Sequence, residues 1–299
     1  MRSAMNKLPS VLKRTAVSFY DDQMTHHAAA LTYYCLMSLF PVALLSLSLL
    51  GLLGQYPATY NSIIGYLRDV APADVVDPLN SALRSALRQQ GTAVAGVAIS
   101  VGLMLYGTTG ALEGARRALN VVFEIESGRS FARRKSIDIA FTFVLIALCI
   151  VTAVLVFVGG SFAADLLGFA GFGSTVTEVW GVARWPAAVV VAMLTFSLIY
   201  YVVPDVQHRG FRYLTPGAAV GVAIWLAVSL GFSFYISRIA EVGAIYGSFA
   251  GAIVLVGWLW LTNVAMLIGA ELDAEIERQH ELDDGVPPAE TLNRPARTG

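Results

Sequence analysis

The charged residues of this chain are absent from long stretches, and this absence limits what the chain can fold into. Six stretches of 20 to 45 consecutive residues contain no Asp, Glu, Lys or Arg, and together they hold 169 of the 299 residues. Charged residues make up 14% of the chain, against about 25% in an average soluble protein. A soluble fold is therefore excluded. A single membrane anchor with a large catalytic domain is also excluded, because no segment between the stretches exceeds about 40 residues.

Each uncharged stretch is long enough to cross a membrane, since a helix needs about 20 apolar residues to do so. The runs are continuously apolar and do not alternate, which favours helices over the strands of a membrane barrel. We therefore predict an all-α polytopic membrane protein with six transmembrane helices. The expected spans are residues 28–53, 91–111, 139–163, 185–203, 213–237 and 243–270.

The distribution of Lys and Arg between the spans predicts the orientation. Segments that face the cytoplasm when the N-terminus is inside carry 15 of the 20 Lys and Arg residues, and the opposite segments carry 5. Basic residues accumulate on the cytoplasmic side of a membrane, so both termini are expected there. The chain then divides into a cytoplasmic segment (1–27), the six-helix transmembrane domain (28–270) and an acidic, partly disordered cytoplasmic tail (271–299).

Short amphipathic helices are expected outside the membrane. Apolar residues recur at helical spacing in the outer segments 60–67 and 76–87, and again in the inner segment 112–124. The inner helix is followed by four cations, Arg129, Arg133, Arg134 and Lys135. Such a cluster either contacts anionic lipid headgroups or only sets the topology, and both interpretations stay open.

A second set of charged residues lies at the inner ends of the spans. These residues are Glu113, Arg116, Arg117, Asp205 and Glu271. All are predicted at one depth, so the helix bundle could gather them into one polar cluster, or each could anchor a separate helix. The span centres contain essentially no charged residue, which argues against a proton- or sodium-coupled pump.

Glycines at intervals of four residues predict close contacts between helices. They are Gly217 and Gly221 in the fifth span, and Gly243, Gly247 and Gly251 in the sixth. This spacing puts small residues on one helix face and lets two backbones approach each other. The pattern does not say whether the partner helix belongs to the same chain, so a homo-oligomer through these faces stays open.

Motifs for chemistry are missing from the sequence. The four histidines and two cysteines have no metal-binding spacing, and no phosphate-binding loop or serine nucleophile motif is present. We therefore expect no enzymatic activity, no metal and no cofactor. Membrane lipids are the expected partners, and nucleic acid is not, since no basic surface is interleaved with aromatic residues.

Several segments resemble the YihY/BrkB family of bacterial inner-membrane proteins over residues 15–278. The segments are Ala28–Pro41, Gly110–Asn120, Tyr201–Asp205, Thr215–Gly217, Tyr246–Ser248 and Gly269–Asp273. The resemblance implies a six-helix protein of the bacterial cytoplasmic membrane. The family has carried the labels ribonuclease BN, widely regarded as a misassignment, and virulence factor BrkB. Some relatives are implicated in envelope lipid export, and the resemblance supplies no catalytic residues.

Two functions fit these observations. The first is transport or flipping of a lipid or other amphiphilic envelope molecule, which suits a basic inner rim and uncharged span centres. The alternative is a non-transporting membrane scaffold or envelope-assembly factor, which suits the glycine faces and the lack of an evident site. The missing metal and RNA-binding motifs argue against a ribonuclease.

Overall fold

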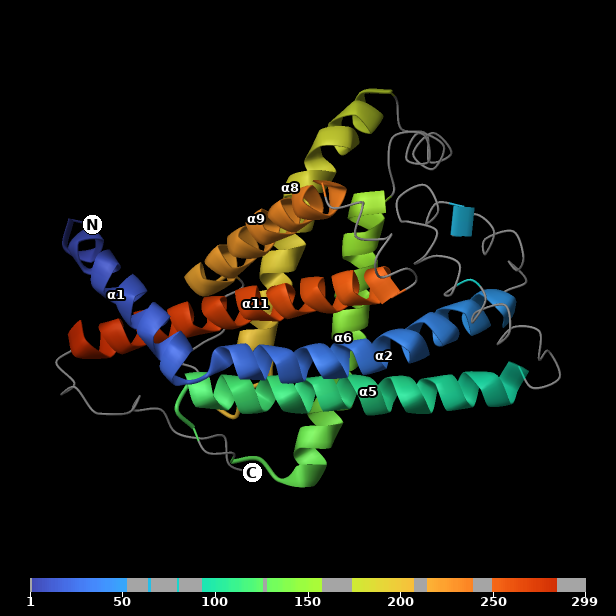
Figure 1. Cartoon of the computed structure of the whole chain (residues 1–299), viewed down its shortest axis with the longest axis horizontal. Coiled ribbons are helices and arrows are strands. Elements are labelled where there is room, and N and C mark those ends of the chain that lie inside the picture. Colours follow the sequence, from blue (N-terminus) through green and yellow to red (C-terminus); the bar gives the residue numbers. More distant parts are fainter. Residues whose placement is uncertain are drawn as a thin grey trace. The chain divides into compact units, whose positions relative to one another are not determined.

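The computed structural model describes residues 2–52, 64–65, 80, 93–125, 128–157, 174–206, 214–238 and 249–283. Nearly all of these residues are helical, which confirms the all-α class (Figure 1). The helices are α1 (Arg2–Asp21), α2 (Met24–Leu52), α5 (Ala93–Val122), α6 (Phe131–Phe157), α8 (Ser174–Val202), α9 (Pro216–Arg238) and α11 (Phe249–Asp283).

Within the described residues, four helical segments are long and apolar enough to cross a membrane. They are Phe131–Thr152, Glu178–Val202, Pro216–Ile236 and Gly251–Asp283. These four segments support the prediction of a polytopic membrane protein. The first two expected spans fall on α2 and α5, which are 29 and 30 residues long. The count of six spans stays a prediction.

Large apolar side chains on these helices point away from the protein. Ile150, Leu230, Phe234 and Ile253 are all exposed. Leu230 and Phe234 lie four residues apart on one face of α9, and an exposed apolar helix face is rare on soluble monomers, because water solvates it poorly. In a bilayer the same side chains contact acyl chains, so the exposed faces fit the membrane environment that the charge pattern predicts.

The chain forms two compact units. Unit 1 comprises residues 1–24, 115–225 and 265–299, and unit 2 comprises residues 25–114 and 226–264. Helices α5, α9 and α11 therefore contribute residues to both units.

In unit 2, helices α2 and α5 approach each other closely. A Cβ atom on Gly107 would lie 2.9 Å from the Cα atom of Ser38, and one on Gly110 would lie 3.0 Å from the ring of Tyr34. Asn263 of α11 donates a hydrogen bond to the hydroxyl oxygen of Thr32 at 3.1 Å. Asn263 is thus a helix–helix hydrogen-bonding residue, as its position within a span suggested.

In unit 1, helix α9 packs tightly against α11 through the first expected glycine pair. A Cβ atom on Gly217 would overlap the carbonyl oxygen of Gly269, and one on Gly221 would lie 3.1 Å from the carbonyl oxygen of Ala265. The partner helix at this contact belongs to the same chain. Gly243 and Gly247 lie outside the described residues, and Gly251 lies near the start of α11.

The start of α9 is fixed by two side chains that accept from its free N–H groups. The Thr215 hydroxyl accepts from the N–H of Ala218 at 3.1 Å, and Pro216 follows as the first helical residue. Asp273 of α11 accepts from the N–H of Gly217 at 2.7 Å. A carboxylate is favoured at this end because the helix dipole is positive there.

The segments outside the expected spans differ from the predictions in two places. The apolar stripe in 112–124 is the end of α5, which runs without a break to Val122 and turns through Glu124 at a φ of 54°. The N-terminal segment forms the helix α1, which charge counting did not predict. The first residues of the acidic tail are helical, since α11 continues to Asp283. Most of segments 60–67 and 76–87, and the Pro-rich end, lie outside the described residues.

The predicted orientation is open to a direct labelling test. In a variant lacking Cys35 and Cys149, a single cysteine at position 130 is expected to resist a membrane-impermeant maleimide applied to intact cells. A single cysteine at position 80 is expected to react. Position 130 suits the test because Ser130 is exposed. The reverse labelling pattern would place the termini outside.

Candidate functional site

A buried ion pair joins α5 to α6 within unit 1. The guanidinium of Arg116 donates to both carboxylate oxygens of Asp138, with a distance of 3.4 Å from Nη1 to Oδ2 and a closer contact from Nη2 to Oδ1. The side chains of Arg116 and Asp138 are only 1% and 2% exposed. This two-pronged geometry fixes the direction of both side chains as well as holding the charges together.

A second carboxylate extends the pair into a network. Asp205 follows the end of α8 and is fully buried, with its Oδ1 atom 3.2 Å from Nε of Arg129 and 4.0 Å from Nε of Arg116. Its backbone N–H donates to Oδ1 of Asn120 on α5 at 2.9 Å. Neither carboxylate oxygen of Asp205 makes a well-directed hydrogen bond with a described residue. Charge attraction therefore holds Asp205 in the network.

Arg116 and Arg129 also donate hydrogen bonds to the backbone at the end of α8. Pro204 cannot continue a helix, so the last carbonyl groups have no N–H partner from a following turn. Arg129 donates to the carbonyl oxygens of Val202 and Pro204, each at 3.1 Å. Arg116 donates to the carbonyl oxygen of Val203 at 3.2 Å. Cations are favoured at this negative end of the helix dipole.

These contacts define the ion network, which consists of Arg116, Arg129, Asp138 and Asp205. It has two positive and two negative charges, so it is neutral as a whole. Burying an unpaired charge costs several kcal/mol, and here each charge faces an opposite one. The network connects α5, α6 and the end of α8 at one end of the membrane helices.

The structure brings together only part of the cluster expected at the inner rim. Arg116 and Asp205 meet in the ion network. Arg117 is exposed, Glu113 belongs to unit 2, and Glu271 is buried on α11 beside a different group of acids. Neighbouring residues on α5 diverge in this way because consecutive side chains on a helix point about 100° apart.

Two members of the network were not expected there. Asp138 lies just before the third expected span and belongs to no predicted cluster. Arg129 is one of the four cations for which lipid contact stays open, but it is 5% exposed and contacts Asp205 and the end of α8. For Asp138 the sequence offers one signal, a carboxylate directly before an uncharged stretch. Nothing local distinguishes Arg129 from the cations after it.

Comparison with known proteins places the chain in a family. The family described as Virulence factor BrkB matches residues 15–292. The chain belongs to the virulence factor BrkB family. No solved structure is significantly similar to it.

Several curated proteins are similar to this BrkB-family chain. It is 28% identical over 262 residues to the putative ribonuclease-like protein YfkH of Bacillus subtilis, covering 87% of this chain and 92% of that one. It is 25% identical to the UPF0761 membrane protein PSHAa0171 of Pseudoalteromonas translucida, covering 91% and 90%. It is 23% identical to the UPF0761 membrane protein RSc1559 of Ralstonia nicotianae, covering 86% of this chain and 56% of that longer protein.

Four of the segments that carry the family resemblance meet within unit 1. Gly110–Asn120 contributes Arg116 to the ion network, and its Asn120 accepts from the backbone N–H of Asp205. Tyr201–Asp205 contributes Asp205 and the carbonyl groups at the end of α8. Thr215–Gly217 and Gly269–Asp273 form the contact between α9 and α11. The residues that these four segments contribute to unit 1 therefore serve packing and charge pairing.

A second polar group lies beside α1 in the same unit. It contains the acids Asp22, Glu124, Glu271 and Glu275 with the cations Arg14 and Arg278. Burial raises the pKa of Asp22 above its ordinary value, and the nearby charges of Glu124 and Asp21 raise it further. No group of three or more described His, Cys, Asp or Glu residues has the arrangement to hold a metal ion.

The remaining cations of the basic cluster lie at the start of α6. Arg133 is exposed, and Arg134 and Lys135 are half-buried. Replacing these three residues by glutamine is expected to reduce the anionic lipid retained from mixed nanodiscs, because each cation contributes about 1 kcal/mol near an anionic surface. Native mass spectrometry would count the retained lipids. The effect should shrink in high salt and in zwitterionic nanodiscs. Equal retention at low salt would leave these residues as topology signals only.

Proposed function

We propose that this protein moves or hands over a lipid or other amphiphilic molecule of the bacterial envelope, without covalent chemistry. One observation carries the proposal. The charged residues of the described membrane helices gather toward the helix ends, while the centres of the four described spans contain none. An amphiphile suits this arrangement because its headgroup needs polar contacts and its tails do not. An ion crossing the span centres would need polar groups there.

The proposed role of the ion network is to hold α5, α6 and the end of α8 in position. The lipid headgroup is proposed to bind elsewhere. The guanidinium of Arg116 is already occupied by Asp138 and by the carbonyl oxygen of Val203. This geometry does not support a headgroup seated jointly on Arg116 and Arg117. Of these two arginines only Arg117 is exposed, so we assign the headgroup contact to Arg117.

A membrane scaffold is the second candidate, and the closed network favours it. Every charge of the network faces an opposite charge, and α9 contacts α11 backbone to backbone at Gly217 and Gly269. A rigid unit of this kind suits a protein that holds other envelope components in place. The two functions differ in one measurable respect, because only the first changes the distribution of lipid between leaflets.

The test is reconstitution in liposomes with labelled lipids, scoring how much label reaches the opposite leaflet. Wild-type protein is expected to raise this fraction above protein-free liposomes. The variant Arg117→Ala should slow anionic labels more than zwitterionic labels. The paired variant Arg116→Met with Asp138→Leu leaves neither residue as an unpaired charge, so it should still fold, yet it should lose lipid movement.

One outcome would contradict the transport proposal, and a second would contradict the part given to the ion network. If no lipid class moves faster than in protein-free liposomes, with ion gradients and with ATP, the scaffold function is supported instead. If the paired variant inserts normally and moves lipid at the wild-type rate, the ion network has no part in the movement.

A further inference from the structure

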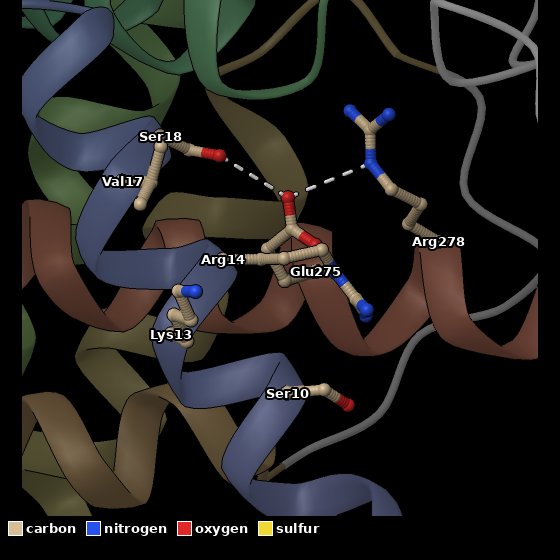
Figure 2. Close-up of a pocket in the computed structure, with 7 residues that line it drawn as sticks. All are labelled: Ser10, Lys13, Arg14, Val17, Ser18, Glu275 and Arg278. Carbon is tan, nitrogen blue, oxygen red and sulfur yellow. Dashed lines mark hydrogen bonds and ion pairs between the residues drawn. The ribbon is translucent and has the colours of Figure 1, made fainter.

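A pocket of about 420 Å³ lies between α1 and α11 within unit 1. Figure 2 shows seven residues that line the pocket. Six of them are polar or charged, and one is apolar. They are Ser10, Lys13, Arg14, Val17, Ser18, Glu275 and Arg278. Three of the seven are cations and one is an anion, so the lining has a net charge of +2. The ion network contributes no residue to this pocket.

Glu275 organises the polar groups of the pocket. Its side chain is 5% exposed, and its Oε2 atom accepts from Nε of Arg14 at 2.7 Å. Its Oε1 atom accepts from the hydroxyl of Ser18 at 3.2 Å and faces Nε of Arg278 at 3.5 Å (Figure 2). The carboxylate thus holds one edge of each guanidinium in a fixed direction. A guanidinium oriented in advance loses less entropy when it binds a ligand.

Donors remain on the cations after these contacts. Nη2 of Arg14 donates to Gln279 at 3.1 Å, and Nη2 of Arg278 donates to Glu124. Among the described residues, no acceptor is bonded to Nη1 of either arginine or to the ammonium of Lys13. Glu124 offsets part of the charge of Arg278. The available positive charge is therefore centred on Lys13 and Arg14, both on α1.

Apolar side chains accompany these donors on α1. Val17 lines the pocket and is about half exposed, and Leu12 and Tyr20 of the same helix are exposed as well. A helix with cations on one side and exposed apolar residues on another is typical of a membrane surface. The helix also ends three residues before α2, the helix of the first expected span. A ligand here would meet cations together with apolar surface.

We propose that this pocket binds the phosphate group of an anionic lipid, with Lys13 and the Nη1 atoms of Arg14 and Arg278 as donors and Val17 against the apolar part of the ligand. The site requires no movement of lipid between leaflets, so it stands independently of the proposed transport. Free phosphate shares the same anionic chemistry, and the comparison of ligands below separates the two sources.

The experiment measures binding to the full-length protein in detergent by titration calorimetry. The probes are a short-chain phosphatidylglycerol, the matching phosphatidylcholine and inorganic phosphate. Saturable binding of phosphatidylglycerol is expected, with the other two probes at least about tenfold weaker. Lys13→Gln is expected to weaken phosphatidylglycerol binding about tenfold, which corresponds to the loss of one hydrogen bond to a charged group. Lys13 is exposed and has no described partner, so this variant should fold.

The matched control is Lys13→Arg, which keeps the positive charge at the pocket and should leave the affinity within about twofold. A second pocket variant, Val17→Asp, places a negative charge at the half-exposed position and should abolish binding. Equal affinity of Lys13→Gln and the wild-type protein would overturn the location of the site. Inorganic phosphate binding as tightly as phosphatidylglycerol would overturn its assignment to a lipid.

Discussion

An Asp205→Asn variant is expected to lose about 3 to 5 kcal/mol of the free energy of unfolding. The substitution preserves the shape of the side chain but removes the negative charge that faces Arg129 at 3.2 Å. Arg129 would then be a buried cation that still donates to carbonyl groups at the end of α8 but no longer faces the carboxylate of Asp205. Chemical denaturation in detergent micelles, followed by circular dichroism, would measure the loss.

Two further variants identify the cause of this loss. Asp283→Asn makes the same chemical change at an exposed carboxylate on α11, which accepts from the side-chain amide of Gln279. Even an exposed ion pair contributes at most about 1 kcal/mol, so this loss should be small. Adding Arg129→Gln to Asp205→Asn removes the uncompensated charge, so part of the stability should return. If Asp205→Asn costs no more than Asp283→Asn, the ion network does not stabilise the fold.

A Gly269→Ala variant is expected to lose about 3 kcal/mol through overpacking between α9 and α11. The added Cβ atom would lie 2.6 Å from the carbonyl oxygen of Gly217 and 2.5 Å from the hydroxyl of Tyr200. The carbonyl is backbone and cannot rotate away, so the two helices must move apart. That movement also weakens the 2.7 Å hydrogen bond from Gly217 to Asp273. The same denaturation measurement reports the effect.

The control for this variant lies on α9 itself. A Cβ atom on Gly231 would meet no atom within 4 Å. Gly231→Ala should therefore be neutral or stabilising by up to about 1 kcal/mol, since alanine favours a helix more than glycine does. A Gly269→Ala variant as stable as Gly231→Ala would show that the close approach of α9 and α11 does not limit the fold.

The membrane helices could be predicted from the sequence because lipid excludes charge. Each segment that crosses the membrane therefore appears in the sequence as a long uncharged stretch. The sequence predicts only that Arg116 and Asp205 lie at the same depth in the membrane. It does not predict that their charges face each other. Arg129 and Arg133 lie four residues apart in one basic cluster, yet one is buried and the other exposed. What separates them is the end of α8, which lies some 70 residues further along and leaves no local signal beside Arg129.

Helix α1 shows a different limit of sequence reasoning. Among residues 9–21 of α1, whose side chains the structure describes, Val11 and Thr15 are buried and lie four positions apart, but one of them is polar. Its partner is the polar extension of α11, so contacts such as Arg14 with Glu275 replace an apolar face. A pattern search for apolar periodicity detects such a helix poorly, because charged and polar pairs stabilise it.

The order in which the ion network can be completed follows from how the chain is made. Synthesis proceeds from the N-terminus, and Asp138 comes only 22 residues after Arg116, so these two charges can pair as soon as α6 is in place. Arg129 must await the carbonyl of Val202, 73 residues later, and then Asp205. Until α8 and Asp205 have been synthesised, these partners of Arg129 do not exist. The folded surroundings of Arg129 can therefore form only after residue 205 has been made.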